Sequence, residues 1–271
     1  MILFTMFIIY AIGLSAILSR RGYRENSTGA VTAPAGHHPT RILIVGATGG
    51  TGRHLVTRAL HRGYEVTAFV RDPGKLIVSH PKLTVVQGNV LGEASVDKAI
   101  RGQDAVLSAL GHKQFLWPTR ILSRGTENVL RSMRAHGVRR LICETSLGLG
   151  DSAGRMGLYY TLFVIPVVLP FYFWDKARQE RLLGASDREW VIVRPGVLTN
   201  GEPRGSCHHD RRAGGFVGTA RITRADVADF MLDQLTSDAY LRRAVGIRQR
   251  VPPAAVTEWA IRSSSCAGRS I

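Results

Sequence analysis

The stretch RILIVGATGGTG, residues 41–52, decides the fold. It begins with a continuous apolar run that ends in glycine, which is typical of a strand buried in a parallel sheet. A helical pattern follows from Thr51 to Arg62, and Gly63 ends it. Between strand and helix, the glycines have the spacing G-x-x-G-x-x-G. A glycine-rich turn in this context predicts the first β–α unit of a nucleotide-binding sheet.

Each glycine of this turn has a physical role in the predicted site. Gly46 permits the tight turn, and Gly49 lets the backbone approach a pyrophosphate. Gly52 allows close packing of the helix on the strand, and the helix N-terminus directs free N–H groups at the phosphates. We therefore expect a dinucleotide to bind on residues 46–52.

The same alternation of strand and helix continues along the chain. We expect further strands at residues 65–70, 83–90, 104–110, 139–146 and 189–196, and helices at 95–102 and 119–137. Such alternation builds βαβ units and a parallel sheet. The predicted fold is α/β, a doubly wound, mostly parallel, Rossmann-like sheet, in a single domain over residues 40–250 with an N-terminal hydrophobic segment. Residues 20–39 read as a linker before this domain and residues 251–271 as a poorly ordered tail after it.

The N-terminus is apolar, and residues 1–18 carry no charge. At about 1.5 Å per residue this length just reaches across a hydrocarbon core. An arginine cluster begins at Arg20, and the positive-inside rule places it on the cytoplasmic side. We expect residues 1–19 to anchor a cytoplasmic domain to a membrane. A signal peptide and a start codon placed too far upstream stay open as alternatives, and with them the presence of residues 1–39 in the mature protein.

The chain is strongly basic, with a net charge of +16. Only five of its 36 basic residues are lysine, and the arginines are scattered without a dense run. A nucleic-acid binder usually concentrates its charge on one face or arm. We expect a generally basic surface and no nucleic-acid partner, with an anionic partner such as membrane lipid or cofactor phosphate as the alternative.

The three cysteines, Cys143, Cys207 and Cys266, are too far apart for a disulfide framework, and none forms a CxxC pair. They fit a reduced compartment best. The run CHHD at residues 207–210 contains metal-binding residue types, but adjacent histidines point in different directions and no partner cluster follows at ligand spacing. We expect a solvated loop there and no metal site.

The end of the second predicted strand bears on the choice of cofactor. An NAD enzyme usually places Asp or Glu there for the ribose, whereas an NADP enzyme places Arg to bind the 2′-phosphate in a bidentate fork. This sequence has Val70-Arg71-Asp72, and Arg71 is the first residue past the apolar run. We predict NADP, with Asp72 as an alternative partner for a ribose.

Longer segments resemble a known family. GATGGTG, GYEVTAFVRDPGKL, GNVLGEASVDKAIRGQDAVLSALG and MRAHGVRRLICETS are similar to the flavin reductase/biliverdin-IXβ reductase group. These proteins are atypical short-chain dehydrogenases within the NmrA-like set of NAD(P)H-binding proteins. The resemblance covers about residues 40–245 and implies an NADP-binding protein.

The resemblance also implies which residues hold the cofactor. The glycine turn and the arginine after the second strand would bind NADP through Gly46, Thr48, Gly49, Gly50, Thr51, Gly52 and Arg71. Asn89 and Val90 would lie near the adenine; the family commonly has Asp where Asn89 stands, and the amide can still accept from the adenine amine. Leu110, Gly111 and Thr145, at the ends of the fourth and fifth strands, would line the ribose and nicotinamide region.

The resemblance is less complete for catalysis. The reductase group carries a serine at the position of Ser146 and often a histidine after the sixth strand. This chain reads Arg194-Pro195-Gly196-Val197 at that place, so that histidine is missing. Ser146 is expected either to donate a hydrogen bond to a substrate carbonyl or only to cap the next turn.

Short-chain dehydrogenases more broadly combine serine with Tyr-x-x-x-Lys, in which the tyrosine gives its proton to the carbonyl. Tyr172 and Lys176 have that spacing, and residues four apart share one helix face. They are the candidate catalytic pair, with Tyr159 and Tyr160 as alternatives to Tyr172. A hydride donor to flavins or quinones can also act without an acid, because the proton can come from water.

The pair lies at the end of an apolar insertion, residues 157–174. Pro166 and Pro170 interrupt it, so a second membrane-spanning helix is not expected. We expect the insertion to wall or cover an apolar substrate pocket, with simple packing as the alternative. Together with the N-terminus it suggests a lipophilic substrate at a membrane surface.

These observations predict an NADPH-dependent oxidoreductase that transfers hydride to a small apolar acceptor, such as a quinone, a flavin or a carbonyl compound. One alternative is a non-catalytic NAD(P)H-binding redox sensor of the NmrA type. Another is an epimerase or dehydratase that retains its NADP. The substrate, the reaction direction and the oligomeric state are left open by the sequence.

Overall fold

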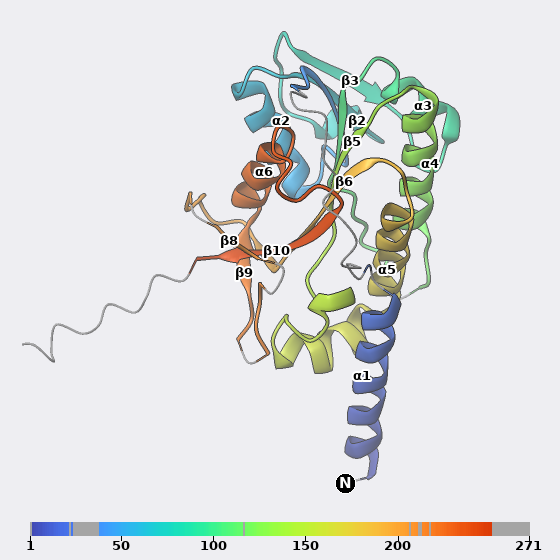
Figure 1. Ribbon diagram of the computed structural model, residues 1–271, viewed down its shortest axis with the longest axis vertical. Helices are drawn as coiled ribbons and strands as arrows, with labels where there is room; N and C mark the ends of the chain where they lie inside the picture. Colours follow the sequence, from blue (N-terminus) through green and yellow to red (C-terminus); the bar gives the residue numbers. More distant parts are fainter. Residues whose placement is uncertain are drawn as a thin grey trace, which may run out of the picture.

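An eight-stranded sheet forms the centre of the fold, in the order β3-β2-β1-β4-β5-β6-β10-β8 (Figure 1). The computed structural model describes residues 2–21, 23, 38–115, 117–205, 207–210, 213–216 and 218–250. Neighbouring strands of the large sheet are parallel, except for β10 with β8. The strands of the large sheet are β1 (Arg41–Val45), β2 (Glu65–Val70), β3 (Leu83–Gln87), β4 (Ala105–Ser108), β5 (Arg140–Glu144), β6 (Glu189–Pro195), β8 (Cys207–Asp210) and β10 (Arg243–Gln249). A separate parallel pair consists of β7 (Val197–Thr199) and β9 (Arg221–Thr223).

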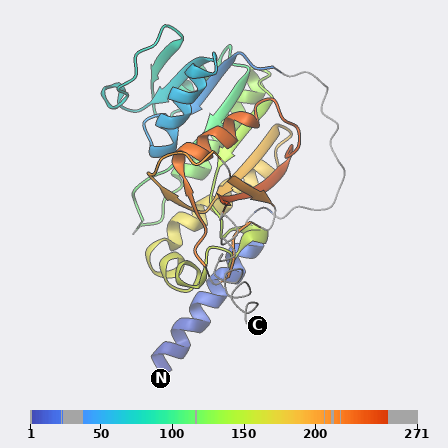
Figure 2. The same ribbon diagram turned by 90° about the vertical axis from the view of Figure 1, so that its left-hand side faces the viewer.

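Helices cover both faces of the sheet. The helices are α1 (Ile2–Arg21), α2 (Gly50–His61), α3 (Glu93–Ile100), α4 (Ile121–Ala135), α5 (Pro170–Gly184) and α6 (Arg224–Asp233), with short 3-10 turns η1 (Pro73–Lys75) and η2 (Gly150–Ser152) and a π-helix η3 (Tyr160–Val168). In Figure 2, α2 and α6 lie side by side on one face, where they contact each other. The helices α3, α4 and α5 pack in sequence on the other face.

The alternation of side chains along β1 explains why both faces are covered. Ile42 and Ile44 are buried in the core shared with α2 and α6, whereas Leu43 and Val45 are buried in the core shared with α3, α4 and α5. Successive residues of a strand point to opposite faces, so a run that is apolar throughout needs helices on both sides. The predicted doubly wound, mostly parallel, Rossmann-like sheet in a single domain is confirmed.

Two local predictions require correction. The third strand ends at Gln87 and not at residue 90. The run at residues 207–210 is not a loop but the edge strand β8, antiparallel to β10, with His209 opposite Ile247. The sequence analysis did not recognise β10, and so it missed the backbone edge on which this polar run pairs. The ring of His209 also contacts the hydroxyl of Tyr240, with 2.7 Å between Nδ1 and the oxygen.

The apolar insertion and the N-terminal helix pack on each other. Residues 157–174 form η3 and the first turn of α5, which begins at Pro170. The helix α1 runs along both, with Leu14 and Leu18 buried and the Tyr10 hydroxyl donating to the carbonyl of Pro166 at 3.1 Å. Among the residues whose side chains the structure describes, no helix is long and apolar enough to cross a membrane. The membrane anchor predicted from the sequence has no support from this finding.

The predicted linker and tail fall almost entirely outside the described residues. Only Arg20, Arg21, Tyr23 and residues 38–39 of the linker are described, and the whole of residues 251–271 lies outside. The division into anchor, linker, domain and tail therefore stays a prediction.

Candidate cofactor site and active site

The glycine turn between β1 and α2 is a close-packed cradle. Gly46 has φ +83°, and a Cβ there would lie 2.6 Å from the carbonyl oxygen of Ala109. A Cβ on Gly52 would collide with the carbonyl oxygen of Gly46. The N–H of Gly49 donates to that same carbonyl at 2.9 Å, which closes the turn. The roles predicted for the first and third glycines, a tight turn and close packing, therefore follow from the backbone itself.

The N-terminus of α2 can receive an anion. Gly49 is its N-cap and provides no side-chain hydrogen bond, and the first turn contains no acidic residue. The first N–H groups of a helix have no intrahelical acceptor, and the helix dipole favours negative charge beside them. Thr48, Gly49 and Gly50 are half or fully exposed at this end, whereas Thr51 is buried. The residues present therefore fit a pyrophosphate.

Arg224, the first residue of α6, was missed by the sequence analysis. A Cβ on Gly50 would collide with its side chain, so this arginine lies directly over the glycine turn. Its guanidinium donates to the side-chain oxygen of Asn200. No local signal in the sequence marks Arg224, because only the α2–α6 packing brings it to the turn. It adds a cation to a site that already fits phosphate.

Arg71 lies at the carboxyl end of β2 with an exposed side chain. No hydrogen bond or ion pair joins its guanidinium to the part of the chain that the structure describes. Asp72, by contrast, is engaged in its own turn: one carboxylate oxygen accepts from the N–H of Gly74 at 3.1 Å, and the other lies 3.2 Å from Lys75 Nζ. The arginine is therefore the available side chain for a ribose substituent.

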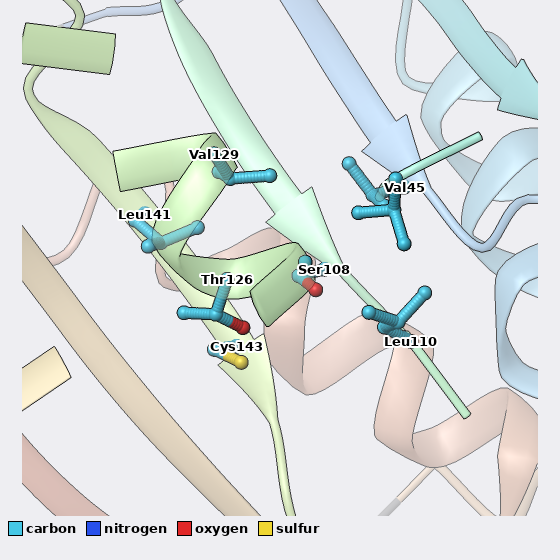
Figure 3. A pocket seen from close by; sticks show the side chains of 9 residues that line it. Val45, Ser108, Leu110, Thr126, Val129, Leu141 and Cys143 are labelled. Carbon is cyan, nitrogen blue, oxygen red and sulfur yellow. The ribbon is translucent and has the colours of Figure 1, made fainter. Parts of the chain in front are cut away.

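The residues predicted to contact the adenine and the ribose lie against a closely packed interior. The side-chain oxygen of Asn89 accepts from the N–H of Leu91 at 3.1 Å. Val90 and Leu110 close on Gly125 of α4, where a Cβ would lie 2.7 Å from Val90 Cγ2 and 3.1 Å from Leu110 Cδ2. Figure 3 shows Val45 and Leu110 near the carboxyl ends of β1 and β4, where both line the interior space between the sheet and α4. That space is too narrow to hold a water molecule, so side chains pack closely beneath the predicted site.

Tyr172 and Lys176 meet at the carboxyl ends of β4 and β5. A Cβ on Gly111 would lie 3.7 Å from the Tyr172 hydroxyl, which places this oxygen beside the predicted nicotinamide region. The Lys176 ammonium lies 5.3 Å from the centre of the Tyr172 ring and donates to the backbone carbonyl of Glu144 at 3.4 Å. Burial of Lys176 disfavours its charge, but interactions with Tyr172 and Glu144 outweigh this effect and raise its pKa. Lys176 therefore keeps its proton beneath the phenol.

Asp175 fixes the helix that carries this pair. Its fully buried carboxylate accepts from the N–H groups of Leu122 and Ser123 at 2.8 and 3.2 Å. These N–H groups belong to the first turn of α4, whose N-cap residue, Arg120, provides no side-chain hydrogen bond. The carboxylate thus replaces the missing cap and ties α5 to α4 next to Tyr172.

A histidine that the sequence analysis did not single out lies against Tyr172. The ring of His112 packs edge-on to the Tyr172 ring with 4.9 Å between centroids. Its Nδ1 accepts from the N–H of Gln114 at 3.2 Å, and its Nε2 lies 3.1 Å from the Thr119 hydroxyl. Burial lowers the pKa of His112. The signal that could have revealed it is its place directly after Leu110-Gly111, at the end of β4.

Thr145 and Ser146 directly follow β5 but face different surroundings. Ser146 is half-buried, with its hydroxyl 3.9 Å from the sulfur of Met156. The hydroxyl of Thr145 donates to Glu180 at 2.8 Å and so points into the protein. Glu180 also binds Arg194, the residue in β6 that precedes Pro195. The catalytic role of Ser146 and the cofactor role of Thr145 stay predictions.

Comparisons with known proteins agree with this geometry. Residues 46–238 match the NAD(P)H-binding family. This chain belongs to that family. The NAD(P)H-binding protein is 27% identical over 223 residues to an uncharacterised chloroplast protein of Arabidopsis thaliana, covering 78% of this chain and 77% of the plant protein.

Solved structures show the same fold. A short-chain dehydrogenase/reductase of Veillonella parvula in complex with NADP has a TM-score of 0.67 and 16% identity, covering 78% of this chain and 95% of that one. An anaerobillin reductase of Escherichia coli O157:H7 has a TM-score of 0.65 and 23% identity, covering 79% of this chain and all of the other. The family match thereby confirms the expected resemblance to NAD(P)H-binding proteins, and these solved structures show that the fold is shared.

Proposed function

We propose that this NAD(P)H-binding protein is an NADPH-dependent reductase that acts on a small apolar carbonyl or quinone. The observation that carries the proposal is the position of Tyr172: its hydroxyl lies beside Gly111 at the carboxyl end of β4, and the Lys176 ammonium lies 5.3 Å from the centre of its ring. Ligands of open α/β sheets bind outside the carboxyl ends of the strands. A phenol at that edge is well placed to protonate a substrate oxygen.

The choice of NADPH over NADH rests on Arg71. An exposed guanidinium without a partner in the described chain can bind a 2′-phosphate in a bidentate fork. The carboxylate of Asp72 would be the ribose ligand of an NAD enzyme, but it is already bound to Gly74 and Lys75. The bound cofactor would supply the hydride, and the glycine turn with Arg224 would hold its pyrophosphate.

The residues around Tyr172 favour an apolar acceptor. The ring centroids of Phe115 and Phe173 lie 5.7 and 6.3 Å from that of Tyr172. In this setting Tyr172 donates its proton to the substrate oxygen. Lys176 then returns a proton to the Tyr172 phenolate or orients the phenol. Ser146 donates a hydrogen bond to the substrate carbonyl. Free thiols at Cys143 and Cys207 fit a reducing compartment, and we propose a cytoplasmic site of action.

The test is NADPH oxidation by the full chain against a panel of flavins, quinones and aromatic carbonyls. Tyr172→Phe keeps the ring packing and removes only the acid, and Tyr160→Phe tests the alternative acid on η3. We expect Tyr172→Phe to lower kcat for a carbonyl substrate roughly 100-fold with unchanged NADPH affinity, because general acids contribute about 10²–10⁴-fold. Quinone or flavin reduction should fall less, since water can supply that proton.

The alternatives give different results in the same assay. Tight NADPH binding without oxidation by any acceptor would indicate the redox sensor. Substrate conversion without net change in NADPH would indicate the epimerase or dehydratase. Carbonyl reduction at an unchanged rate in Tyr172→Phe would contradict the acid role of Tyr172.

A further inference from the structure

One end of the molecule exposes an unusual amount of apolar surface. We call it the apolar pole. Its exposed large side chains come from α1 and from the segment of η3 and early α5: Met6, Ile9, Ile12, Ile17, Leu158, Tyr159, Phe163, Val167, Val168 and Phe171. The two segments lie side by side at the end of the molecule away from the bulk of the sheet (Figure 1). Residues 2–19 and 157–174 contain no charged side chain.

Such a surface needs a partner. Soluble monomers rarely expose contiguous apolar patches beyond a few hundred Å², and larger ones mark protein or membrane contacts. The two segments also hold each other in place, through buried Ala11, Leu14 and Ile165 and through the hydrogen bond from Tyr10 to Pro166. The exposed side chains are therefore presented on a built surface with its own small core.

A cavity of about 440 Å³ opens beside this surface, between α1 and α5. Apolar and aromatic side chains form much of its lining: Tyr10, Leu14, Phe171 and Trp174. Two cations, Arg120 and Arg178, also line the cavity. Pro118, Thr119 and Pro170 complete the lining. The cavity lining thus combines apolar side chains with two cations.

The two arginines are available to an anion. No carboxylate among the described residues lies within ion-pair distance of Arg120 or Arg178. The Arg178 guanidinium packs over the ring of Trp174, 5.9 Å from its centre, which orients it at the cavity. Trp117, 76% exposed, stands in the loop that leads to Arg120. Tryptophan and tyrosine beside arginine are the residues enriched at the boundary between lipid and water.

We propose that the apolar pole lies in the interfacial layer of an anionic bilayer, and that the α1–α5 cavity binds the phosphate headgroup of one lipid through Arg120 and Arg178. The guanidinium fork matches phosphate, and the apolar lining matches the first part of an acyl chain. A second copy of this chain is a poorer occupant, because a symmetric contact would bring four unpaired arginines together beside the apolar surface. The net charge of +16 favours an anionic surface in the same way.

The membrane would then lie close to the reaction site. Phe171 and Trp174 of the cavity flank Tyr172 on the same turn of α5. An apolar acceptor dissolved in the bilayer would reach Tyr172 from this side. The proposal for the cavity does not depend on the proposed reductase activity, since lipid binding is measured without NADPH.

The experiment is flotation of the full chain with vesicles of neutral phosphatidylcholine, with and without a fraction of anionic phosphatidylglycerol. We expect tighter binding to the anionic vesicles. The variant Arg120→Ala/Arg178→Ala should bind anionic vesicles roughly 30-fold more weakly, since each arginine at an anionic surface contributes a factor of about five. The backbone N–H groups at the start of α4 keep their cap on Asp175 in this variant.

The matched control is Arg101→Ala/Arg131→Ala, which removes the same charge from exposed arginines on α4 and just after α3. It should bind anionic vesicles within about twofold of the wild type. Equal losses in both variants would overturn the cavity site and leave only general charge attraction. Absence of vesicle binding, together with dimerisation that depends on protein concentration, would assign the apolar pole to a second copy and overturn the proposal.

Discussion

The hydroxyl of Thr51 donates a hydrogen bond of 3.0 Å to the buried carboxylate of Glu144. Thr51 lies in the first turn of α2, directly after the glycine turn, and Glu144 ends β5. The backbone carbonyl of Glu144 accepts from Lys176, which lies beneath Tyr172. A single residue thus joins the helix that would receive the cofactor phosphates to the helix that carries the proposed acid.

Replacement of Glu144 by Gln should change how stability depends on pH. Burial raises the pKa of Glu144, so the folded state holds its proton at pH values where the unfolded chain has released it. The contribution of Glu144 to stability is therefore fully present below the unfolded pKa of about 4.3 and is lost as pH rises through the folded pKa. As pH rises through this range, Glu144→Gln should become more stable relative to the wild type. Urea unfolding at a series of pH values measures this difference. A difference that is constant with pH would contradict this account.

Gly52→Ala should disrupt the cradle. Its Cβ would collide with the carbonyl of Gly46, which is backbone and cannot turn away as a side chain can. We expect a loss of about 1–3 kcal/mol in the free energy of unfolding, together with weaker NADPH binding. Gly218→Ala is the control, because a Cβ there meets no heavy atom within 4 Å. Thermal unfolding and NADPH titration of both variants decide the matter; equal stability of the two would count against close packing at Gly52.

Glu180→Ala should be far more costly than loss of a surface pair. Arg194 and Glu180 are 2.8 Å apart and both almost completely buried. Removal of Glu180 leaves the buried Arg194 with only the partly exposed Asp151 as a counter-ion. Loss of one partner of a buried pair costs about 3–5 kcal/mol. The exposed pair of Arg62 with Asp233 is the comparison, and Asp233→Ala should cost less than about 1 kcal/mol. Chemical denaturation measures the free energy of unfolding of both variants. Similar losses in the two would contradict a larger stabilising contribution from the buried pair.

The thiol of Cys143 should be inert in the native state. Burial raises its pKa to about 12, and thiolate is the reactive form. Iodoacetamide at neutral pH should label Cys207, which is half-buried, before Cys143, with the labelled peptides identified by mass spectrometry. Unfolding in urea should abolish the difference between the two. Rapid native labelling of Cys143 would contradict the packed interior behind the site in Figure 3.

Much of the fold could be predicted because its signals are local. The apolar run before Gly46 predicts a buried strand, and the helix-ending glycines Gly63, Gly102 and Gly137 all have positive φ in the structure. The Rossmann-like sheet followed from the order of these units. Strand β10 and the edge strand β8 beside it did not, since polar residues such as those at 207–210 become a strand only through a partner far along the chain.

Some residues of the candidate site could likewise be predicted from short motifs, and others could not. The glycine turn and the spacing of Tyr172 and Lys176 are visible in the sequence as short motifs. Glu144 and Arg224 were not recognised, because each depends on contacts between distant segments. His112 follows Leu110-Gly111 directly, but its contact with Tyr172 also joins distant segments. The side chain of Thr145 turns into the protein because Glu180, on α5, binds it there, which no pattern near residue 145 indicates.

The most direct test of the central claim is calorimetric titration of NADPH and NADH into the wild type and Arg71→Ala, with Arg53→Ala as a control arginine on α2. We expect the wild type to bind NADPH more tightly than NADH. Arg71→Ala should weaken NADPH binding roughly 10- to 100-fold and leave NADH binding unchanged, since a hydrogen bond to a charged group contributes about 1.5–3 kcal/mol. Equal losses for both cofactors, or no binding of either by the wild type, would contradict the account.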